Sequence, residues 1–132
     1  DGSFHMNLNE GCTAVSYELP IITVIFDNQV LGMVRQWQDL FYDRRYSHTE
    51  MHNPDFVKLA ESMGVKALRC DSLDELPAKM KEFIEYDNNR PILLEARVVK
   101  TEHVYPMVPA GKSLEEQVLH PSFAAPPPRD PM

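Results

Sequence analysis

Three short apolar runs, separated by longer segments with helical periodicity, constrain the fold of this chain more than any other feature. The runs are IITVIF at residues 21–26, VKALRC at 65–70 and PILLEARV at 91–98. The first is β-branched or apolar throughout, which is typical of a strand buried on both faces of a parallel sheet. Strands that alternate with helices predict an α/β fold, a parallel sheet flanked by helices and joined by right-handed crossovers.

Two of the helical segments flank the first strand. Residues 6–17 predict a helix, weakened by Gly11, whose apolar face holds Leu8, Cys12 and Val15. After the turn DNQ, residues 31–41 predict a second helix with Leu31, Val34 and Gln38 along one side. The polar and aromatic stretch that follows, residues 42–52, has no clear period and predicts a loop.

Two more helical segments lie on either side of the second strand. Asn53 as cap and Pro54 as first residue begin one helix, which Gly64 ends. Its apolar stripe consists of Phe56, Val57, Leu59, Ala60 and Met63. A capping box of Ser72 and Glu75 precedes the other helix, at residues 74–86. Its inward residues are predicted to be Leu76, Met80, Phe83 and Ile84.

Length and composition limit the classes of protein. With 132 residues we expect one domain or part of one, with the sheet at residues 1–112 and a short helix and proline-rich tail at 113–132. No run of about 18 apolar residues occurs, which argues against a membrane partner. A net charge of −7 without a basic stripe argues against nucleic acid. Cys12 and Cys70 lack ligand or disulfide spacing, which favours a reducing compartment, the cytoplasm or an organellar matrix.

Polar residues at two strand ends suggest a site. Asp1, Gly2 and Ser3 directly precede a helix, so their backbone N–H groups and the Ser3 hydroxyl suit a phosphate. Asn28 follows the first strand, and one helix and one strand separate it from Asp1. Carboxylate and amide oxygens at one sheet edge are ligands for Mg²⁺, which also accepts phosphate oxygens. The same residues are common in ordinary turns, so the spacing alone leaves both interpretations open.

Longer motifs resemble one family. DGSF followed by Asn28 resembles the thiamine-diphosphate-binding motif. The segments NQVLGMVRQWQDLFYDRRYSH, NPDFVKLAESMGVKALR and VYPMVPAGKSLEE are similar to the C-terminal domain of acetolactate synthase catalytic subunits. The resemblance covers about residues 1–119. It implies the thiamine-diphosphate-binding fold, as a partial domain whose first strand would lie upstream of Asp1.

The resemblance also implies roles for individual residues. Asp1 and Asn28 would be the side-chain ligands of Mg²⁺, and the carbonyl of Val30 would be a backbone ligand. Gly2 and Ser3 would contact the diphosphate.

Three apolar residues receive roles from the same resemblance. Trp37 would border the active-site channel and favour 2-ketobutyrate as second substrate, while Met33 and Met6 would lie near the cofactor. Without the resemblance, Trp37 and Met33 are typical of a helix face buried in the core.

Four positions depart from the family pattern. Asp27 replaces the first of two asparagines and adds a negative charge near the cation site, unless its side chain points toward the sheet. Val30 lacks a polar side chain, and Gly11 and Cys12 replace leucine-type helix residues. None of these changes removes a predicted ligand.

The remaining polar residues fit weaker hypotheses. The histidines have no ligand periodicity, and they are His5, His48, His52, His103 and His120. His48 is interpreted as a loop or interface contact. Arg44 and Arg45 are either solvated or close the active-site entrance, and Glu115 and Glu116 are expected on an exposed helix face. The spacing suggests no Ser/His/Asp or Cys/His arrangement.

The resemblance implies an enzyme that condenses two pyruvates, or pyruvate and 2-ketobutyrate, with loss of CO₂ in branched-chain amino acid biosynthesis. Its cofactors would be thiamine diphosphate and Mg²⁺, with FAD in the full-length enzyme. Its partners would be the same chain, in a homodimer or tetramer, and a small regulatory subunit. The glutamate that activates the cofactor would come from the partner subunit, so we expect no catalytic residue here and no activity from the isolated chain.

Two alternatives remain open. The first is another thiamine-diphosphate enzyme, such as a pyruvate oxidase or a 2-keto acid decarboxylase, which the motifs GMVRQWQ and YPMVPAG disfavour. The second is an inactive fragment that binds other subunits through unpaired sheet edges.

Overall fold

The computed structural model describes residues 1–87 and 89–123, which fall into two compact units. The first unit is Asp1–Thr101 and contains the sheet, and the second begins at Glu102. This division lies eleven residues before the boundary predicted at residue 112. The boundary of the cofactor-binding domain at residue 112 stays a prediction. The proline-rich tail from residue 124 onward lies outside the described residues.

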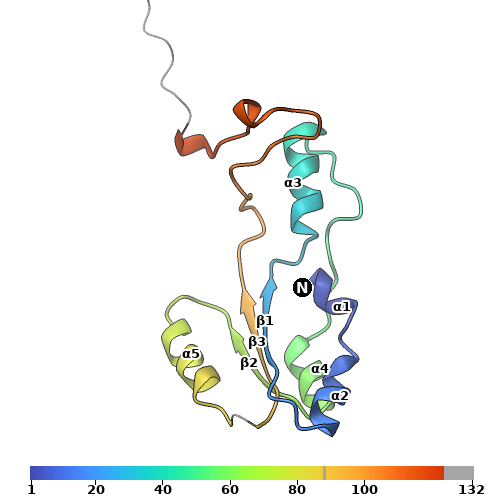
Figure 1. Ribbon diagram of the computed structural model, residues 1–132, viewed down its shortest axis with the longest axis vertical. Helices are drawn as coiled ribbons and strands as arrows, with labels where there is room; N and C mark the ends of the chain where they lie inside the picture. Colours follow the sequence, from blue (N-terminus) through green and yellow to red (C-terminus); the bar gives the residue numbers. More distant parts are fainter. Residues whose placement is uncertain (88, 124–132) are drawn as a thin grey trace, which may run out of the picture. The chain divides into compact units, whose positions relative to one another are not determined.

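Three parallel strands form the centre of the first unit, in the order β1-β3-β2 (Figure 1). β1 is Ile22–Asp27, β2 is Lys66–Cys70 and β3 is Ile92–Arg97. The register places Val24 of β1 and Leu68 of β2 on either side of Leu94 in β3. The predicted parallel α/β sheet is confirmed, and all three strands lie close to the predicted runs.

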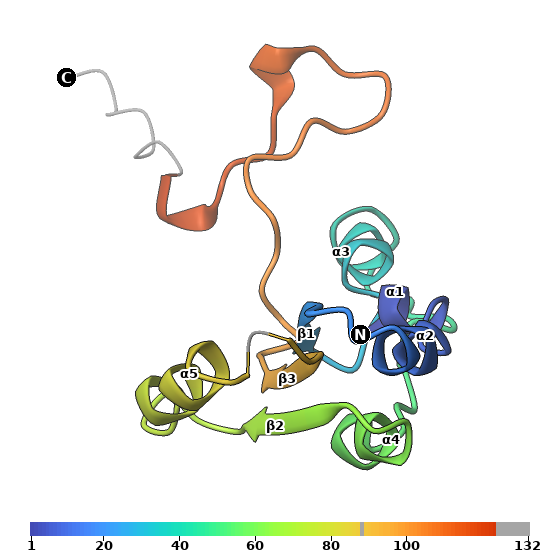
Figure 2. The ribbon, with the colours of Figure 1, turned by 60° about the horizontal axis from the view of Figure 1, so that its bottom comes forward.

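Helices cover the two faces of the sheet unequally. α1 (Gly2–His5), α2 (Glu10–Ser16) and α4 (Phe56–Ser62) lie on one side of the strands, and α5 (Leu76–Ile84) lies on the other (Figure 2). α3 (Gly32–Phe41) follows the carboxyl end of β1. Because crossover helices lie on both faces, the polar ends of the strands stay open at the carboxyl edge.

Two apolar clusters fill the space between sheet and helices. The cluster under α4 contains Ile25, Phe56, Ala60, Val65, Ala67 and Leu93. The cluster under α5 contains Leu68, Cys70, Phe83, Ile92 and Leu94. The predicted stripe of α4 is confirmed, since Phe56 and Ala60 are buried and the other three residues pack against them. Gly64 ends this helix with a φ of +86°, a conformation that costs glycine little.

The prediction that β1 is buried on both faces is wrong. Ile25 and Asp27 are buried, but Ile22 and Phe26 on the opposite face are 68% and 65% exposed. β1 is an edge strand, and α5 covers only β2 and β3 on that side of the sheet. β3, the central strand, is the one with two buried faces.

Two helix predictions need correction. The segment 6–17 is not one helix, since a turn at residues 6–9 separates α1 from α2, and Cys12 is exposed. In α3, Leu31 and Val34 are exposed and the buried residue is Gln36, so the predicted apolar side does not face the core. The segment at residues 42–52 is confirmed as a loop, and its Thr49 is buried.

The starts of α4 and α5 also differ from the prediction. The cap of α4 is Asp55, whose carboxylate accepts from the Lys58 amide at 3.2 Å, and Asn53 lies outside the helix. α5 begins at Leu76, after a turn in which the Glu75 amide donates to the Ser72 hydroxyl at 3.4 Å. Ile84 is exposed, whereas Phe83 is buried and Leu76 and Met80 pack against it.

The described part of the second unit has little regular structure. Its two short 3₁₀ helices are Leu114–Glu116 and Pro121–Phe123, so the predicted amphipathic helix after residue 112 is a single turn. Glu116 accepts from Lys112 at 2.7 Å, a contact that lowers the pKa of this carboxyl. Across residues 1–87 and 89–123, none of the helices combines the length and the apolar character that crossing a membrane requires.

Candidate functional site

A hollow of about 330 Å³ lies beyond the carboxyl end of β1. Its lining joins the first residues of the chain, the turn after β1 and the first turn of α3. Of the predicted site residues, the hollow brings together Asp1, Gly2, Ser3, Asn28, Val30 and Met33. The side-chain positions therefore agree with the sequence prediction that Asp1 and Asn28 meet at one sheet edge, while their role as ligands stays a prediction.

The Asp1 carboxylate ties the start of the chain to the turn after β1. Its Oδ1 accepts from the Gly2 amide at 2.9 Å, which caps α1. Its Oδ2 accepts from the amide of Gln29, also at 2.9 Å. These two bonds fix the carboxylate at the rim of the hollow without any cationic side chain.

Asn28 and Val30 belong to a tight turn. The Asn28 Oδ1 accepts from the Val30 amide at 3.1 Å, and Gln29 between them has a φ of +58°. Val30 is 2% exposed, and no hydrogen bond to its carbonyl oxygen is found among the described residues. Asn28 keeps a second lone pair on Oδ1, so both oxygens can serve a cation.

Two glycines let backbone segments approach the hollow closely. A Cβ atom on Gly2 would meet Leu31 Cδ2 at 2.9 Å and Met51 Sδ at 3.1 Å. A Cβ atom on Gly32 would lie 3.0 Å from Asn28 Nδ2. A larger residue at Gly2 would require the Leu31 and Met51 side chains to shift.

The loop that follows α3 returns to this turn. The Leu31 amide donates to the Thr49 carbonyl at 2.8 Å, and the Met51 amide donates to the Gln29 carbonyl at 2.9 Å. Gln38 of α3 holds the same loop, since its Nε2 donates to the Ser47 carbonyl at 3.0 Å and its Oε1 accepts from the Thr49 hydroxyl at 3.0 Å. The loop is therefore held both by the backbone of the turn after β1 and by the Gln38 side chain of α3.

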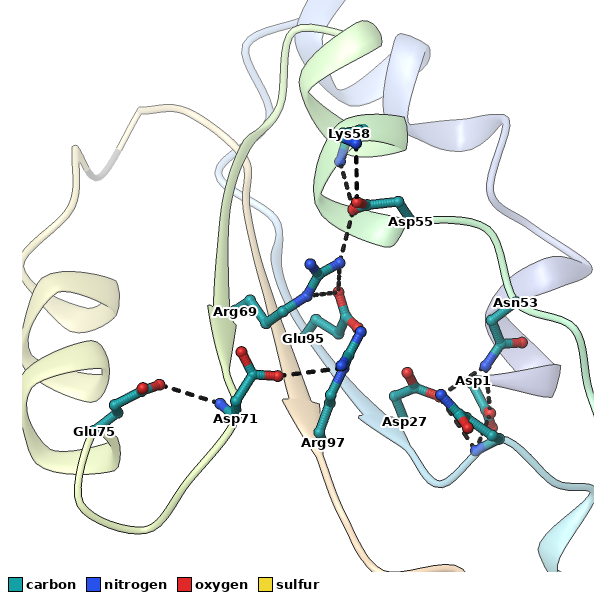
Figure 3. Close-up of polar contacts among 11 residues, drawn as sticks. Asp1, Asp27, Asn53, Asp55, Lys58, Arg69, Asp71, Glu75, Glu95 and Arg97 are labelled. Atoms are coloured by element: carbon teal, nitrogen blue, oxygen red, sulfur yellow. Dashed lines mark hydrogen bonds and ion pairs between the residues drawn. The ribbon is translucent and has the colours of Figure 1, made fainter.

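Asn53 is a site residue that the sequence reasoning assigned to helix capping. Its Nδ2 donates to Asp1 Oδ2 at 2.8 Å and to Asp27 Oδ1 at 2.7 Å, so one amide lies between two carboxylates (Figure 3). Asp27 is 4% exposed, and its carboxylate contacts Asn53. The sequence left open whether this side chain lies near the cation site or points toward the sheet, and the structure places it beside Asp1. The signal in the sequence was the Asn-Pro pair, which here places Asn53 in an extended approach to α4.

A second, larger hollow of about 690 Å³ lies beside α3. Its lining includes Met33, Trp37, Tyr42 and Arg45, and Trp37 packs edge-on against Phe41 with ring centroids 5.3 Å apart. Met33 lines both hollows, so the predicted cofactor and specificity residues occupy neighbouring positions on one helix. Arg45 reaches this hollow, whereas Arg44 pairs with Asp39 at 3.2 Å.

Other predicted residues lie elsewhere. Met6 is 74% exposed and lines neither hollow. His5 packs edge-on against Phe56 at 5.6 Å, and His48 is exposed with its Nδ1 2.8 Å from the Ser47 hydroxyl. Glu115 and Glu116 are exposed on a 3₁₀ turn, as expected for solvated carboxylates.

A network of charged side chains lies next to the site, on the same side of the sheet as α4. Arg69 donates to Glu95 at 2.9 Å and to Asp55 at 2.7 Å, and the Glu95 side chain is only 2% exposed. The hydrogen bond to Glu95 raises the pKa of Arg69. The backbone bond from Lys58, with help from Arg69, lowers the pKa of Asp55. Figure 3 shows this network and the Asn53 cluster side by side.

The donor set around the first hollow fits a hard divalent cation. Mg²⁺ prefers carboxylate, amide and carbonyl oxygens and keeps water or phosphate in its remaining positions. Asp1, Asn28 and Val30 line the hollow and carry such oxygens, and Gly2 and Ser3 line it beside them. Within the described residues there is no group of three His, Cys, Asp or Glu side chains that would hold a metal by itself. A cation here would therefore need oxygens from a second ligand, such as a diphosphate.

Comparison with known proteins agrees with this chemistry. Residues 1–96 match the family described as thiamine pyrophosphate enzyme, C-terminal TPP binding domain. A solved thiamine diphosphate-dependent 4-hydroxybenzoylformate decarboxylase from Rhodococcus jostii RHA1 superposes with a TM-score of 0.67 over 75% of this chain and 18% of its own. At 23% identity, this likeness supports the fold alone.

Curated relatives are much more similar in sequence. The mitochondrial acetolactate synthase of Schizosaccharomyces pombe is 48% identical over 94% of this chain, and the mitochondrial catalytic subunit of Saccharomyces cerevisiae is 50% identical over 88%. A probable acetolactate synthase large subunit from Methanocaldococcus jannaschii is 49% identical over 86%. The chain spans only 17% to 19% of the length of these relatives. On the family match, this chain belongs to the thiamine pyrophosphate enzymes and carries their C-terminal TPP binding domain.

Proposed function

We propose that this chain is the diphosphate- and Mg²⁺-binding part of an acetolactate synthase. The observation that carries the proposal is identity of 42% to 50% with acetolactate synthase chains over about nine-tenths of the sequence. The reaction would condense two pyruvates, or pyruvate and 2-ketobutyrate, with loss of CO₂. Relatives about five times longer support the view that the chain works within a longer polypeptide, which would also bind FAD.

The residues of this chain would bind and orient the cofactor. Asp1, Asn28 and the Val30 carbonyl would hold Mg²⁺, and Gly2 and Ser3 would receive the diphosphate beside it. Thiamine diphosphate, when bound, supplies the carbanion chemistry. Met33 would lie against the cofactor, and the more distant Met6 would need a neighbouring domain to bring it there.

Trp37 would select the second substrate. It lines the larger hollow next to Met33, and its indole narrows the space over α3. Arg45 at the same rim supplies a positive charge that suits a 2-keto acid carboxylate. Such an enzyme would act as a homodimer or tetramer, with a small regulatory subunit, in the cytoplasm or an organellar matrix.

Formation of 2-acetolactate by the full-length protein that carries this chain tests the proposal. Asp1→Ala and Asn28→Ala are expected to reduce turnover by at least about tenfold at limiting Mg²⁺, because each removes an oxygen ligand. Asp74→Ala and Asn9→Ala, exposed positions away from the hollow, are the matched controls. Unchanged turnover in both site variants would contradict the proposal, and acetaldehyde or acetyl phosphate as product would favour a decarboxylase or an oxidase.

A further inference from the structure

The side-chain amide of Asn53 donates hydrogen bonds to two carboxylates at once, although the side chain carries no charge. Its Nδ2 lies 2.8 Å from Asp1 Oδ2 and 2.7 Å from Asp27 Oδ1. The backbone N–H of Gln29 donates to the same two oxygens, at 2.9 Å to Asp1 Oδ2 and at 3.2 Å to Asp27 Oδ1. Two N–H donors therefore separate two acids, and no Lys or Arg is paired with either acid among the described ion pairs.

The orientation of the Asn53 amide is fixed by this cluster. If its oxygen pointed toward Asp1 and Asp27, three acceptors would face one another without a proton between them. Its Oδ1 instead lies on the far side, where it is buried and has no hydrogen-bond partner in the described chain. The two carboxylates, rather than any bond to the oxygen, hold the side chain in place.

The backbone around Asn53 delivers it to this position. Residues 49–51 pair with residues 29–31, and the Asp55 cap starts α4 two positions after Asn53. The amide is thus clamped between an anchored loop and a helix start, so it can hold Asp1 at small cost in side-chain entropy.

The bonds around Asp1 also select the oxygen that remains available. A carboxylate has about four acceptor positions, two on each oxygen. Gln29 and Asn53 occupy both positions on Oδ2, and Gly2 occupies one on Oδ1. The free position is on Oδ1, so Asn53 directs that oxygen toward an incoming cation.

We propose that Asn53 is a positioning residue of the Mg²⁺ site, whose amide aligns the Asp1 carboxylate and keeps the Asp27 carboxylate from repelling it. This inference rests on the proposed function and adds to it a residue that does not touch the metal. Asp27 is held beside the site as a second acid, and the shared amide stands between its Oδ1 and Oδ2 of Asp1.

The test measures the Mg²⁺ concentration that gives half-maximal thiamine diphosphate binding to the full-length protein, by titration calorimetry. Asn53→Ala is expected to raise this concentration at least about tenfold, the effect of losing one hydrogen bond to a charged acceptor. Asn53→Asp, which has the same shape but adds a third acid, should raise it further. Adding Asp27→Asn to Asn53→Asp should recover part of the loss, because it returns an amide and removes the added charge.

Asn9→Asp is the matched control, since the Asn9 amide also donates to a carboxylate, that of Glu10 at 3.2 Å, on the exposed surface. The control should leave the Mg²⁺ requirement within about twofold of wild type, the usual scatter between independent sites. Melting temperatures without Mg²⁺ and cofactor separate alignment from folding. If Asn53→Asp does not fold, Asn53→Ala decides.

Two results would overturn the inference. These are an unchanged Mg²⁺ requirement in both Asn53 variants, whether or not their melting temperatures fall, and an equal rise of the requirement in Asn9→Asp. Each of these leaves a wild-type protein that binds Mg²⁺ and forms 2-acetolactate. A wild-type protein that does neither would instead contradict the proposed function, and the positioning role with it.

Discussion

At the scale of single residues, the buried acid Glu95 depends on its neighbours for charge compensation. Its side chain is 2% exposed, Arg69 contacts it at 2.9 Å and Arg97 at 3.4 Å. Arg69→Met is expected to lower the free energy of unfolding by about 3 kcal/mol, since removal of one partner leaves a buried charge. Denaturant unfolding of the protein, followed by circular dichroism, measures the change.

A double variant separates the charge from the packing. Adding Glu95→Leu to Arg69→Met should recover most of the loss, because an apolar pair of similar volume often replaces a buried ion pair without cost. Arg90→Met is the matched control, since its pair with Asp87 at 3.8 Å is exposed, and it should change stability by less than about 0.5 kcal/mol. A loss in the control as large as in Arg69→Met would rule out burial as the cause.

Residues also differ in how much the sequence could predict of them. Phe56 and Ala60 follow a local helical pattern, so their burial was predictable. Asp1 and Asn28 were brought to one edge by the βα alternation alone. The role of Asn53 depends on acids 52 and 26 positions away, and no local pattern encodes such a contact. Its neighbour Pro54 instead made it look like a helix cap.

At the scale of elements, α3 and the loop after it form one assembly through Gln38. This side chain bonds Ser47 and Thr49 at once, although Gln38 lies on a helix and its partners on the returning loop. Gln38→Leu is expected to speed amide hydrogen exchange in residues 45–51, because the loop loses all three of its hydrogen bonds to this side chain while α3 keeps its backbone. Mass spectrometry of exchanged peptides measures this effect.

Gln38→Glu distinguishes the bond that Gln38 donates from the bonds that it accepts. The carboxylate still accepts from Thr49 but no longer donates to the Ser47 carbonyl, so an intermediate exchange rate is expected. The peptide covering β3 is the internal reference and should keep the wild-type rate, since β3 is central in the sheet. Equal exchange in all three proteins would mean that the backbone pairing at Val30 and Glu50 holds the loop alone.

The helices and strands were predicted well where the elements that pack against them also belong to this chain. β2, β3 and α4 have their covering neighbours among the described residues, and their burial agrees with the sequence. β1 has apolar residues on both faces, yet one face is exposed. The apolar pattern predicts that both faces are buried, but it does not say which segment buries each of them. The same limit applies to α3, whose exposed Leu31 and Val34 lie toward the hollow instead of the core.

At the scale of the whole molecule, the exposed face of β1 predicts self-association. Ile22, Val24 and Phe26 form an apolar stripe on an edge strand of the sheet. Residues 1–132 produced alone are therefore expected to elute above the monomer mass in size-exclusion chromatography with light scattering. Val24→Lys together with Phe26→Lys should shift the chain toward the monomer.

Leu73→Lys is the control for this shift, since Leu73 is 84% exposed in a loop away from β1 and its change should leave the mass as it is. A monomer in the unmodified chain would contradict the prediction. Association without Mg²⁺-dependent cofactor binding would favour the alternative of a subunit-binding fragment over a cofactor site.

The strand order has a consequence for biosynthesis. β1 and β2 both pair with β3 and not with each other, and β3 is the last of the three to leave the ribosome. Until β3 emerges, β1 and β2 lack the strand that both pair with, and their exposed apolar side chains favour aggregation and binding to chaperones. Slow translation after residue 97 would give the nascent sheet time to close, whereas slow codons between β2 and β3 would prolong its most aggregation-prone interval.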